Sequence, residues 1–231
     1  AMLAFSLLDA GVEVTVEKPD GSPVQRGDVV LRMSGPARAI LAAERVALNF
    51  MCQLSGIATA TAALVAAARP HRASIVCTRK TTPGLRILEK HAIRAGGGGN
   101  HRFGLDDAVL IKDNHVAVAG GVRPAIERVK RAVGHLVKVE VEVDSLAQLE
   151  EALATGADAV LLDNMTLEQM AEAVKRVNGR MLTEASGGIT LETVGPIAAT
   201  GVDLISSGWL THSAPALDLG DRKSTRLNSS H

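Results

Sequence analysis

The chain has 231 residues, 46% of them hydrophobic, which suffices for one large core and a small accessory lobe. Lys and Arg together number 25, as do Asp and Glu, and Tyr is absent, so composition argues against binding to nucleic acid or to a membrane surface. With only Cys52 and Cys77, and no apolar run of about 18 residues, we expect a cytoplasmic protein without a disulfide framework, membrane span or export leader.

The first part of the chain predicts a small α+β lobe. Two β-rich stretches, VEVTV from Val12 and DVVLRMSG from Asp28, are separated by the turn-rich KPDGSP and are typical of an antiparallel pair. Pro36 stands where a helix favours its first residue, and ARAILAAERVALNFMCQLSG follows at helical spacing. We therefore assign residues 1–70 to a partial N-terminal α+β lobe with a linking helix, to which the C-terminal segment can also return.

After this lobe, short apolar runs alternate with helical stretches. LAQLEEALATG and LEQMAEAVKRVNG have apolar residues three to four positions apart and end in Gly. The last four apolar runs begin about 22 residues apart, the length of a strand and its crossover helix, which favours a parallel α/β barrel or a doubly wound sheet. The expected strands are SIVCTRK from Ser74, AVLIKDN from Ala108, VKVEVEVD from Val137, AVLLDNM from Ala159, MLTEASGG from Met181 and DLISSGW from Asp203.

Polar groups follow each of these strands. In an α/β barrel the carboxyl ends of the strands meet at one mouth, so the groups would converge there. Helix caps and turns are the alternative, and six such endings favour a site over them. The endings are Thr78-Arg79-Lys80, Lys112-Asp113-Asn114, Glu142 with Asp144, Asp163-Asn164, Ser186-Gly187-Gly188 and Ser207-Gly208.

Charges are segregated along the same region. Residues 79–115 contain seven Lys or Arg against four acids, and residues 137–165 contain one Lys against seven acids, for which solvated helix faces are the alternative explanation. In VKVEVEV, alternation places Lys138, Glu140 and Glu142 on one face and four valines on the other. If helices cover the valines, the acidic face points into the barrel, where Lys138 would compensate one carboxylate and a cationic ligand or metal the other.

The cations predict a pocket for an anion with several charges. Arg offers a planar fork that matches a carboxylate, and Lys offers a point charge suited to phosphate. The four glycines 96–99 would bring backbone close to the ligand and turn the next residues inward, although a flexible linker would look the same. The pocket cations are Arg79, Lys80, His101, Arg102 and Lys112.

The last two strands end in SGGIT and SSGW, which favour a phosphate cradle. Backbone N–H groups and a helix N-terminus after Thr190 would receive the phosphate, and in barrels this site often follows the final two strands. Each stretch by itself is also typical of an ordinary turn.

Taken together, TRKTTPGLR, GGGGNHRFGLDDAVLIKDNH, VEVEVDSLAQLEEAL, LLDNM, SGGIT and GWLTHS resemble the quinolinate phosphoribosyltransferase family, the decarboxylating nicotinate-nucleotide pyrophosphorylases of NAD biosynthesis, from about residue 5 to 220. The resemblance implies an irregular parallel α/β barrel over residues 71–212 and a C-terminal return segment over 213–220. It also implies an N-terminally truncated α+β sandwich lobe, because family members begin with a longer segment. Residues 221–231 fit no pattern and are interpreted as a non-native tail.

The reaction that the resemblance implies is phosphoribosyl transfer from phosphoribosyl pyrophosphate to quinolinate with decarboxylation, in a homodimer or higher homo-oligomer that uses Mg²⁺. Glu142, Asp163, Lys80 and Lys112 would be catalytic, with Glu142 and Asp163 at the metal directly or indirectly. Quinolinate would be bound by Arg45 (donated across the subunit interface), Thr78, Arg79, Lys80, His101, Arg102 and Lys112. The phosphoribosyl donor would be bound by Glu142, Asp163, Ser186, Gly187, Gly188, Ser207 and Gly208.

Two alternatives remain open from the sequence. One is a related phosphoribosyltransferase that acts on another pyridine or heterocyclic acid, and the other is an inactive truncated fragment that binds anions. The chain also departs from the family at Cys77, where Asp or Gly is common, and at Trp209, where a small residue usually follows the phosphate-loop glycine.

Overall fold

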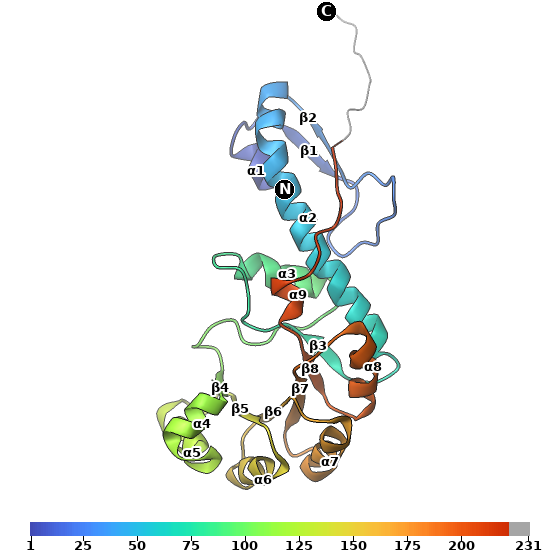
Figure 1. Cartoon of the computed structure of the whole chain (residues 1–231). Coiled ribbons are helices and arrows are strands. Elements are labelled where there is room, and N and C mark those ends of the chain that lie inside the picture. The colour runs from blue at the N-terminus through green and yellow to red at the C-terminus, as the bar shows by residue number, and fades with distance from the viewer. Residues whose placement is uncertain (222–231) are drawn as a thin grey trace, which may run out of the picture. The chain divides into compact units, whose positions relative to one another are not determined.

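The computed structural model describes residues 1–221, so the segment 222–231, nearly all of the tail set apart above, lies outside the described residues. The chain forms two units, Ala1–Gly56 with the C-terminal segment from Pro215, and Ile57–Ala214. Figure 1 labels the elements of both units. The helices are α1 Met2–Ser6, α2 Ala37–Ala68, α3 Arg86–Ala95, α4 Asp113–Ala119, α5 Val122–Ala132, α6 Leu146–Thr155, α7 Leu167–Val177, α8 Leu191–Ala199 and α9 Trp209–His212.

The first unit contains the expected antiparallel pair. Strands β1 (Glu13–Val16) and β2 (Leu31–Ser34) are paired with Glu13 opposite Ser34, which confirms the prediction. The small core under this pair consists of Phe5, Val12, Ala43 and Ala47.

Helix α2 begins directly after Pro36, as expected, but continues past Gly56, where the expected stretch ended. At Gly56 the passing C-terminal segment requires a glycine, because a Cβ there would lie 2.1 Å from the carbonyl oxygen of Pro215. By length and composition α2 could cross a membrane, although its sequence contains no unbroken apolar run of the length expected for a span. One such helix is weak evidence for a span, because core helices share this character, and Ile57, Leu64 and Ala68 are buried.

The second unit is built on a parallel sheet with the strand order β3-β8-β7-β6-β5-β4, which confirms the six expected strands and the α/β class. Strands β3 and β4 are the two edges of this sheet and, within residues 1–221, they do not pair with each other, so the barrel is open between them. The bounds are β3 Ser74–Val76, β4 Val109–Ile111, β5 Val139–Val143, β6 Ala159–Asp163, β7 Leu182–Ser186 and β8 Leu204–Ser206.

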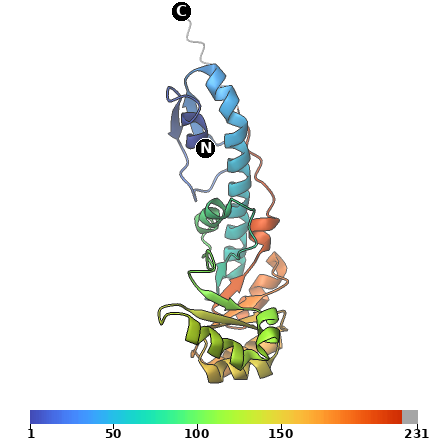
Figure 2. The same ribbon diagram turned by 90° about the vertical axis from the view of Figure 1, so that its left-hand side faces the viewer.

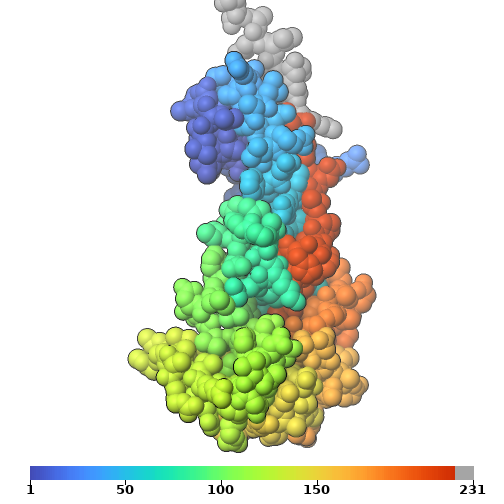
Figure 3. All heavy atoms as spheres, turned by 60° about the vertical axis from the view of Figure 1, so that its left-hand side comes forward, coloured from blue at the N-terminus to red at the C-terminus, as the bar shows by residue number. Residues whose placement is uncertain are grey.

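Helices cover the outer side of the sheet. Helices α5, α6 and α7 lie outside strands β4 to β7 in Figures 1 and 2, and in Figure 3 the side chains of this region, in green and yellow, form a continuous surface. Val139, Val141 and Val143 of β5 are accordingly buried, as expected. The role expected for Lys138 is wrong, because its Nζ lies at the exposed end of the strand and pairs with Asp158 Oδ1 at 2.6 Å.

Candidate active site

A cavity of about 730 Å³ lies in the second unit, where the carboxyl ends of the strands meet. Arg45 is on the exposed surface of α2 in the first unit and is not among its lining residues. Every other residue predicted for the site lines this cavity. They are Thr78, Arg79, Lys80, His101, Arg102, Lys112, Glu142, Asp163, Ser186, Gly187, Gly188, Ser207 and Gly208.

Two guanidinium groups lie on the cationic side of the cavity. Arg79 Nε is buried and has no hydrogen-bond partner among residues 1–221, and an unpaired buried donor of this kind is costly unless a ligand accepts from it. Burial, and then the positive charge of Arg79, lower the pKa of Arg102. The proximity of these two cations raises the positive potential in the cavity, which favours a ligand with more than one negative charge.

The acidic side of the cavity is formed by β5 and β6. Lys112 Nζ lies 3.5 Å from Glu142 Oε2, and Asn164 donates to Asp163 Oδ2 over 2.8 Å. Asn164 adopts a left-handed conformation (φ 51°), which turns the chain sharply after β6. Carboxylate and amide oxygens are the hard ligands that Mg²⁺ prefers, so the donor set at these strand ends fits this ion.

The Ser186-Gly187-Gly188 turn requires its glycines. Gly187 has φ 95°, and a Cβ there would lie 2.1 Å from Asn164 Oδ1, so a side chain would strain the backbone and collide with the acidic side of the cavity. Thr190 caps α8 and accepts hydrogen bonds from the N–H groups of Glu192 and Thr193. The cap uses two N–H groups of the first turn of α8, so these are not available to a phosphate. A phosphate would therefore be bound mainly by the Ser186-Gly187-Gly188 turn and less by the helix N-terminus than the sequence indicated.

The four glycines 96–99 have another role than the one expected from the sequence. A Cβ on Gly96 would lie 2.3 Å from the carbonyl oxygen of Ala58, and one on Gly98 would lie 2.7 Å from Thr61 Cγ2, both on α2. Gly99 donates its N–H to Ile75 O over 2.8 Å and so continues the edge at β3. None of the four lines the cavity, so they pack the loop against α2 and β3 rather than bring backbone to a ligand.

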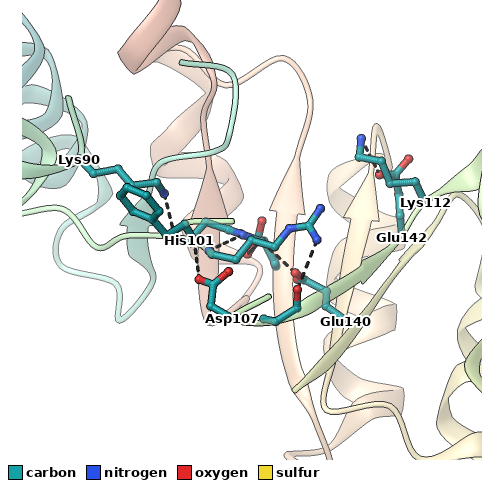
Figure 4. A network of polar contacts seen from close by, with 10 residues as sticks. Lys90, His101, Asp107, Lys112, Glu140 and Glu142 are labelled. Carbon is teal, nitrogen blue, oxygen red and sulfur yellow. Dashed lines mark hydrogen bonds and ion pairs between the residues drawn. The ribbon is translucent and has the colours of Figure 1, made fainter. Parts of the chain in front are cut away.

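Beside the predicted residues lies a buried network that the sequence analysis did not assign, shown in Figure 4. His101 Nε2 lies 2.9 Å from Glu140 Oε2 and 3.7 Å from Glu184 Oε2. Lys90, only 2% exposed, donates from Nζ to the His101 carbonyl oxygen over 2.8 Å and to Cys77 Sγ over 3.1 Å. A Glu inside the strand LTEAS and a Lys on the buried face of α3 were the sequence signals for this network.

The network fixes which ring nitrogen of neutral His101 carries the proton. Burial lowers the pKa of His101, but the hydrogen bond that its Nε2 donates to Glu140 and the charge of Glu184 outweigh burial, so the pKa of His101 is raised. The Arg102 backbone N–H donates to Nδ1 over 2.8 Å, which opposes a second proton on the ring. We assign the ring proton to Nε2, facing Glu140.

Glu184 makes stability depend on pH. Burial, and then the charge of Glu140, raise the pKa of Glu184 from 4.5 to about 7. Its folded-state pKa exceeds the unfolded value, so the stability from this proton is complete below the unfolded pKa and is lost as pH rises through 7. Glu184→Gln, which cannot ionise, should therefore be more stable than the parent chain at about pH 8, by at most about 3 kcal/mol, and not at about pH 5. Thermal unfolding midpoints across this pH range check the prediction, and an equal difference at both ends would contradict it.

Comparison with known proteins identifies relatives of both units. Residues 1–55 match the N-terminal domain of quinolinate phosphoribosyl transferase, and residues 57–220 match its C-terminal domain. Nicotinate-nucleotide pyrophosphorylase [carboxylating] of Mycobacterium leprae is 48% identical over 91% of this chain and 75% of its own length. Quinolinate phosphoribosyltransferase [decarboxylating] 1b of Nicotiana tabacum is 43% identical over 98% of this chain and 69% of its own length. The crystal structure of NadC from Streptococcus pyogenes has a TM-score of 0.89 at 48% identity and covers 93% of this chain and 76% of that one.

Proposed function

The chain belongs to the quinolinate phosphoribosyltransferase family, and on this premise we propose that it transfers the phosphoribosyl group of phosphoribosyl pyrophosphate to quinolinate with loss of CO₂. The products are nicotinate mononucleotide and pyrophosphate, in NAD biosynthesis. The observation that carries the proposal is a single cavity with paired guanidiniums on one side and Glu142 with Asp163 on the other. This arrangement suits a reaction in which a pyridine with two carboxylates attacks a sugar carbon on which positive charge develops.

The acid substrate would lie on the cationic side. Arg79 and Arg102 supply planar forks for its two carboxylates, and the unpaired Arg79 Nε would gain an acceptor when the acid binds. Lys80 and Lys112 add positive charge that also faces the phosphoribosyl donor. With both carboxylates held, the ring nitrogen is fixed in one orientation toward the sugar.

Transfer then exchanges one bond for another at the anomeric carbon. The nitrogen lone pair forms the N–C1′ bond while the C1′–O bond to pyrophosphate breaks, and pyrophosphate leaves with that electron pair. Positive charge that develops on the sugar is stabilised by the fixed carboxylates of Glu142 and Asp163, and the lysines neutralise the leaving group. In the product the ring nitrogen is cationic, so it stabilises the electron pair left at the adjacent carbon when CO₂ departs, and a proton then replaces CO₂ there.

We propose that Mg²⁺ is held by Glu142 and Asp163, directly or through water, with Asn164 as a further oxygen donor nearby. When bound, the ion supplies positive charge that neutralises the pyrophosphate oxygens. The 5′-phosphate would lie on the Ser186-Gly187-Gly188 and Ser207-Gly208 turns, which line the same cavity.

The proposal includes a homodimer or higher homo-oligomer. Arg45 is exposed on α2 and is not one of the residues that line the cavity, so its expected contact with quinolinate would be made in the cavity of a second subunit. A cytoplasmic location accompanies this proposal, since both Cys52 and Cys77 are free thiols.

Release of CO₂ from quinolinate labelled in the carboxyl group next to the ring nitrogen tests the function. We expect label to be released when phosphoribosyl pyrophosphate and Mg²⁺ are both present and not when either is omitted. Turnover of nicotinate instead of quinolinate would favour a related phosphoribosyltransferase. Calorimetric binding of quinolinate with no product would favour an anion-binding fragment without turnover.

A further inference from the structure

Two glutamates, Glu184 fully buried and Glu140 largely buried, lie beside the cationic side of the cavity, and the reaction described above gives them no part. Glu140 is on β5 and Glu184 on β7, so strand β6 separates them in the sheet, yet both reach the His101 ring. The Oε1 atom of each is buried and has no partner in the described part of the chain. Two carboxylates in such a position are costly, which indicates that they serve the site rather than the stability of the fold.

The His101 residue is fixed at its ring and at its backbone. Its ring donates through Nε2 to Glu140 over 2.9 Å, and its Nδ1 accepts the Arg102 backbone N–H. Its carbonyl oxygen accepts a hydrogen bond from the buried Lys90. With these atoms engaged, the ring has one orientation, and the backbone that carries the Arg102 side chain is fixed with it (Figure 4).

Arg102 is held by the same arrangement. One guanidinium nitrogen donates to Ala108 O over 3.3 Å, and the charge of Glu140 acts favourably on the guanidinium. Glu140 therefore stabilises two consecutive residues, His101 by a hydrogen bond and Arg102 by its charge.

We propose that Glu140 and Glu184 are positioning residues for the acid substrate, which orient His101 and Arg102 and keep substrate carboxylates from settling deeper than the guanidiniums. The inference rests on the proposed function for the identity of the acid. Repulsion between like charges gives the second part of the role, because an anion that moved toward the glutamates would leave the arginines and approach the negative charge of Glu140.

Calorimetric binding of quinolinate to the whole chain, without phosphoribosyl pyrophosphate, tests the role of Glu140 independently of turnover. Glu140→Ala should weaken binding about 10- to 100-fold, the range seen when a histidine that binds a metal loses the carboxylate that orients it. Glu140→Gln should recover much of this loss, because its amide oxygen still accepts the Nε2 proton. Glu184→Gln should weaken binding less, because Glu184 lies farther from the ring at 3.7 Å.

A double-mutant cycle separates positioning from general damage. If Glu140 acts through His101, Glu140→Ala should weaken binding by less than about 2-fold when His101→Ala is already present. The exposed Glu168 of α7 offers a control, Glu168→Ala, which should leave binding unchanged. An equal loss from Glu140→Ala in both backgrounds would overturn the proposal, as would equal weakening by the Gln and Ala variants.

The same experiment distinguishes failure of the proposed function from failure of the positioning role alone. If the parent chain does not bind quinolinate, the proposed function fails and the positioning role fails with it. If the parent chain binds and the glutamate variants bind equally well, the positioning role alone fails. Donor atoms of His101, Glu140 and Glu184 lie within 4.8 Å of one another, so stoichiometric Zn²⁺ binding that Glu184→Gln abolishes would instead establish a metal site and overturn positioning.

Discussion

Replacing Arg79 with Ala is expected to raise the KM for quinolinate about 100-fold, because a buried charge pair between guanidinium and carboxylate is lost. Its Nε is buried without a partner in the described chain, so the substrate is the group that would pair with it. The KM for phosphoribosyl pyrophosphate should change far less. Initial rates with each substrate varied in turn measure the two constants.

Two further variants sharpen this result. Arg79→Lys should recover little, since an ammonium cannot form the paired hydrogen bonds of the planar fork. Arg123→Ala, on the exposed outer helix α5, removes the same charge away from the cavity and should behave like the parent chain. A rise in KM that is shared equally by both substrates would place Arg79 elsewhere than at the quinolinate carboxylates.

Glu142→Gln and Asp163→Asn should each lower kcat about 100- to 1000-fold, the usual cost of removing one preorganised group that stabilises charge in the transition state. Both substitutions keep the shape of the side chain and remove its charge. For the same reason each variant should need more Mg²⁺ to reach half of its maximal rate, because an oxygen donor for the ion is weakened. Single-turnover rates over a series of Mg²⁺ concentrations measure both effects.

A control for these variants is Glu127→Gln on the exposed side of α5, which should leave kcat unchanged. If Glu142→Gln raised only the KM values and left kcat intact, the carboxylate would contribute to binding and not to the stabilisation of the sugar cation.

The strand pattern explains why so much of the site could be predicted. The regular spacing of four apolar runs predicted the parallel sheet. Parallel strands bring their carboxyl ends together whatever the length of the segments that connect them. Lys112 and Asp163 therefore line one cavity although 51 positions separate their sequence numbers. The opening of the barrel between β3 and β4 could not be predicted, because apolar periodicity does not report whether two edge strands pair with each other.

Other features depend on contacts between distant segments, which local patterns do not report. In the sequence Gly56 is typical of a helix end. In the structure the helix continues through Gly56, and a glycine is needed there because the backbone of Pro215 lies close to it. Lys138 alternates with Glu140 and Glu142, yet at the strand end its flexible side chain reaches Asp158. The place of Glu184 in the buried network could not be predicted, because it depends on contacts with His101 and Glu140, which come from other parts of the chain.

The burial of Cys77 gives this protein an internal chemical reporter. Its thiol is 0% exposed, next to Lys90 and 3.4 Å from Asn100 Oδ1, whereas Cys52 is partly accessible. An alkylating reagent can reach Cys77 only when the groups around it, which include Lys90 of α3 and Asn100, move away. The slow phase of thiol labelling in the native protein would therefore time local opening around the network of Lys90 and His101 without any introduced label.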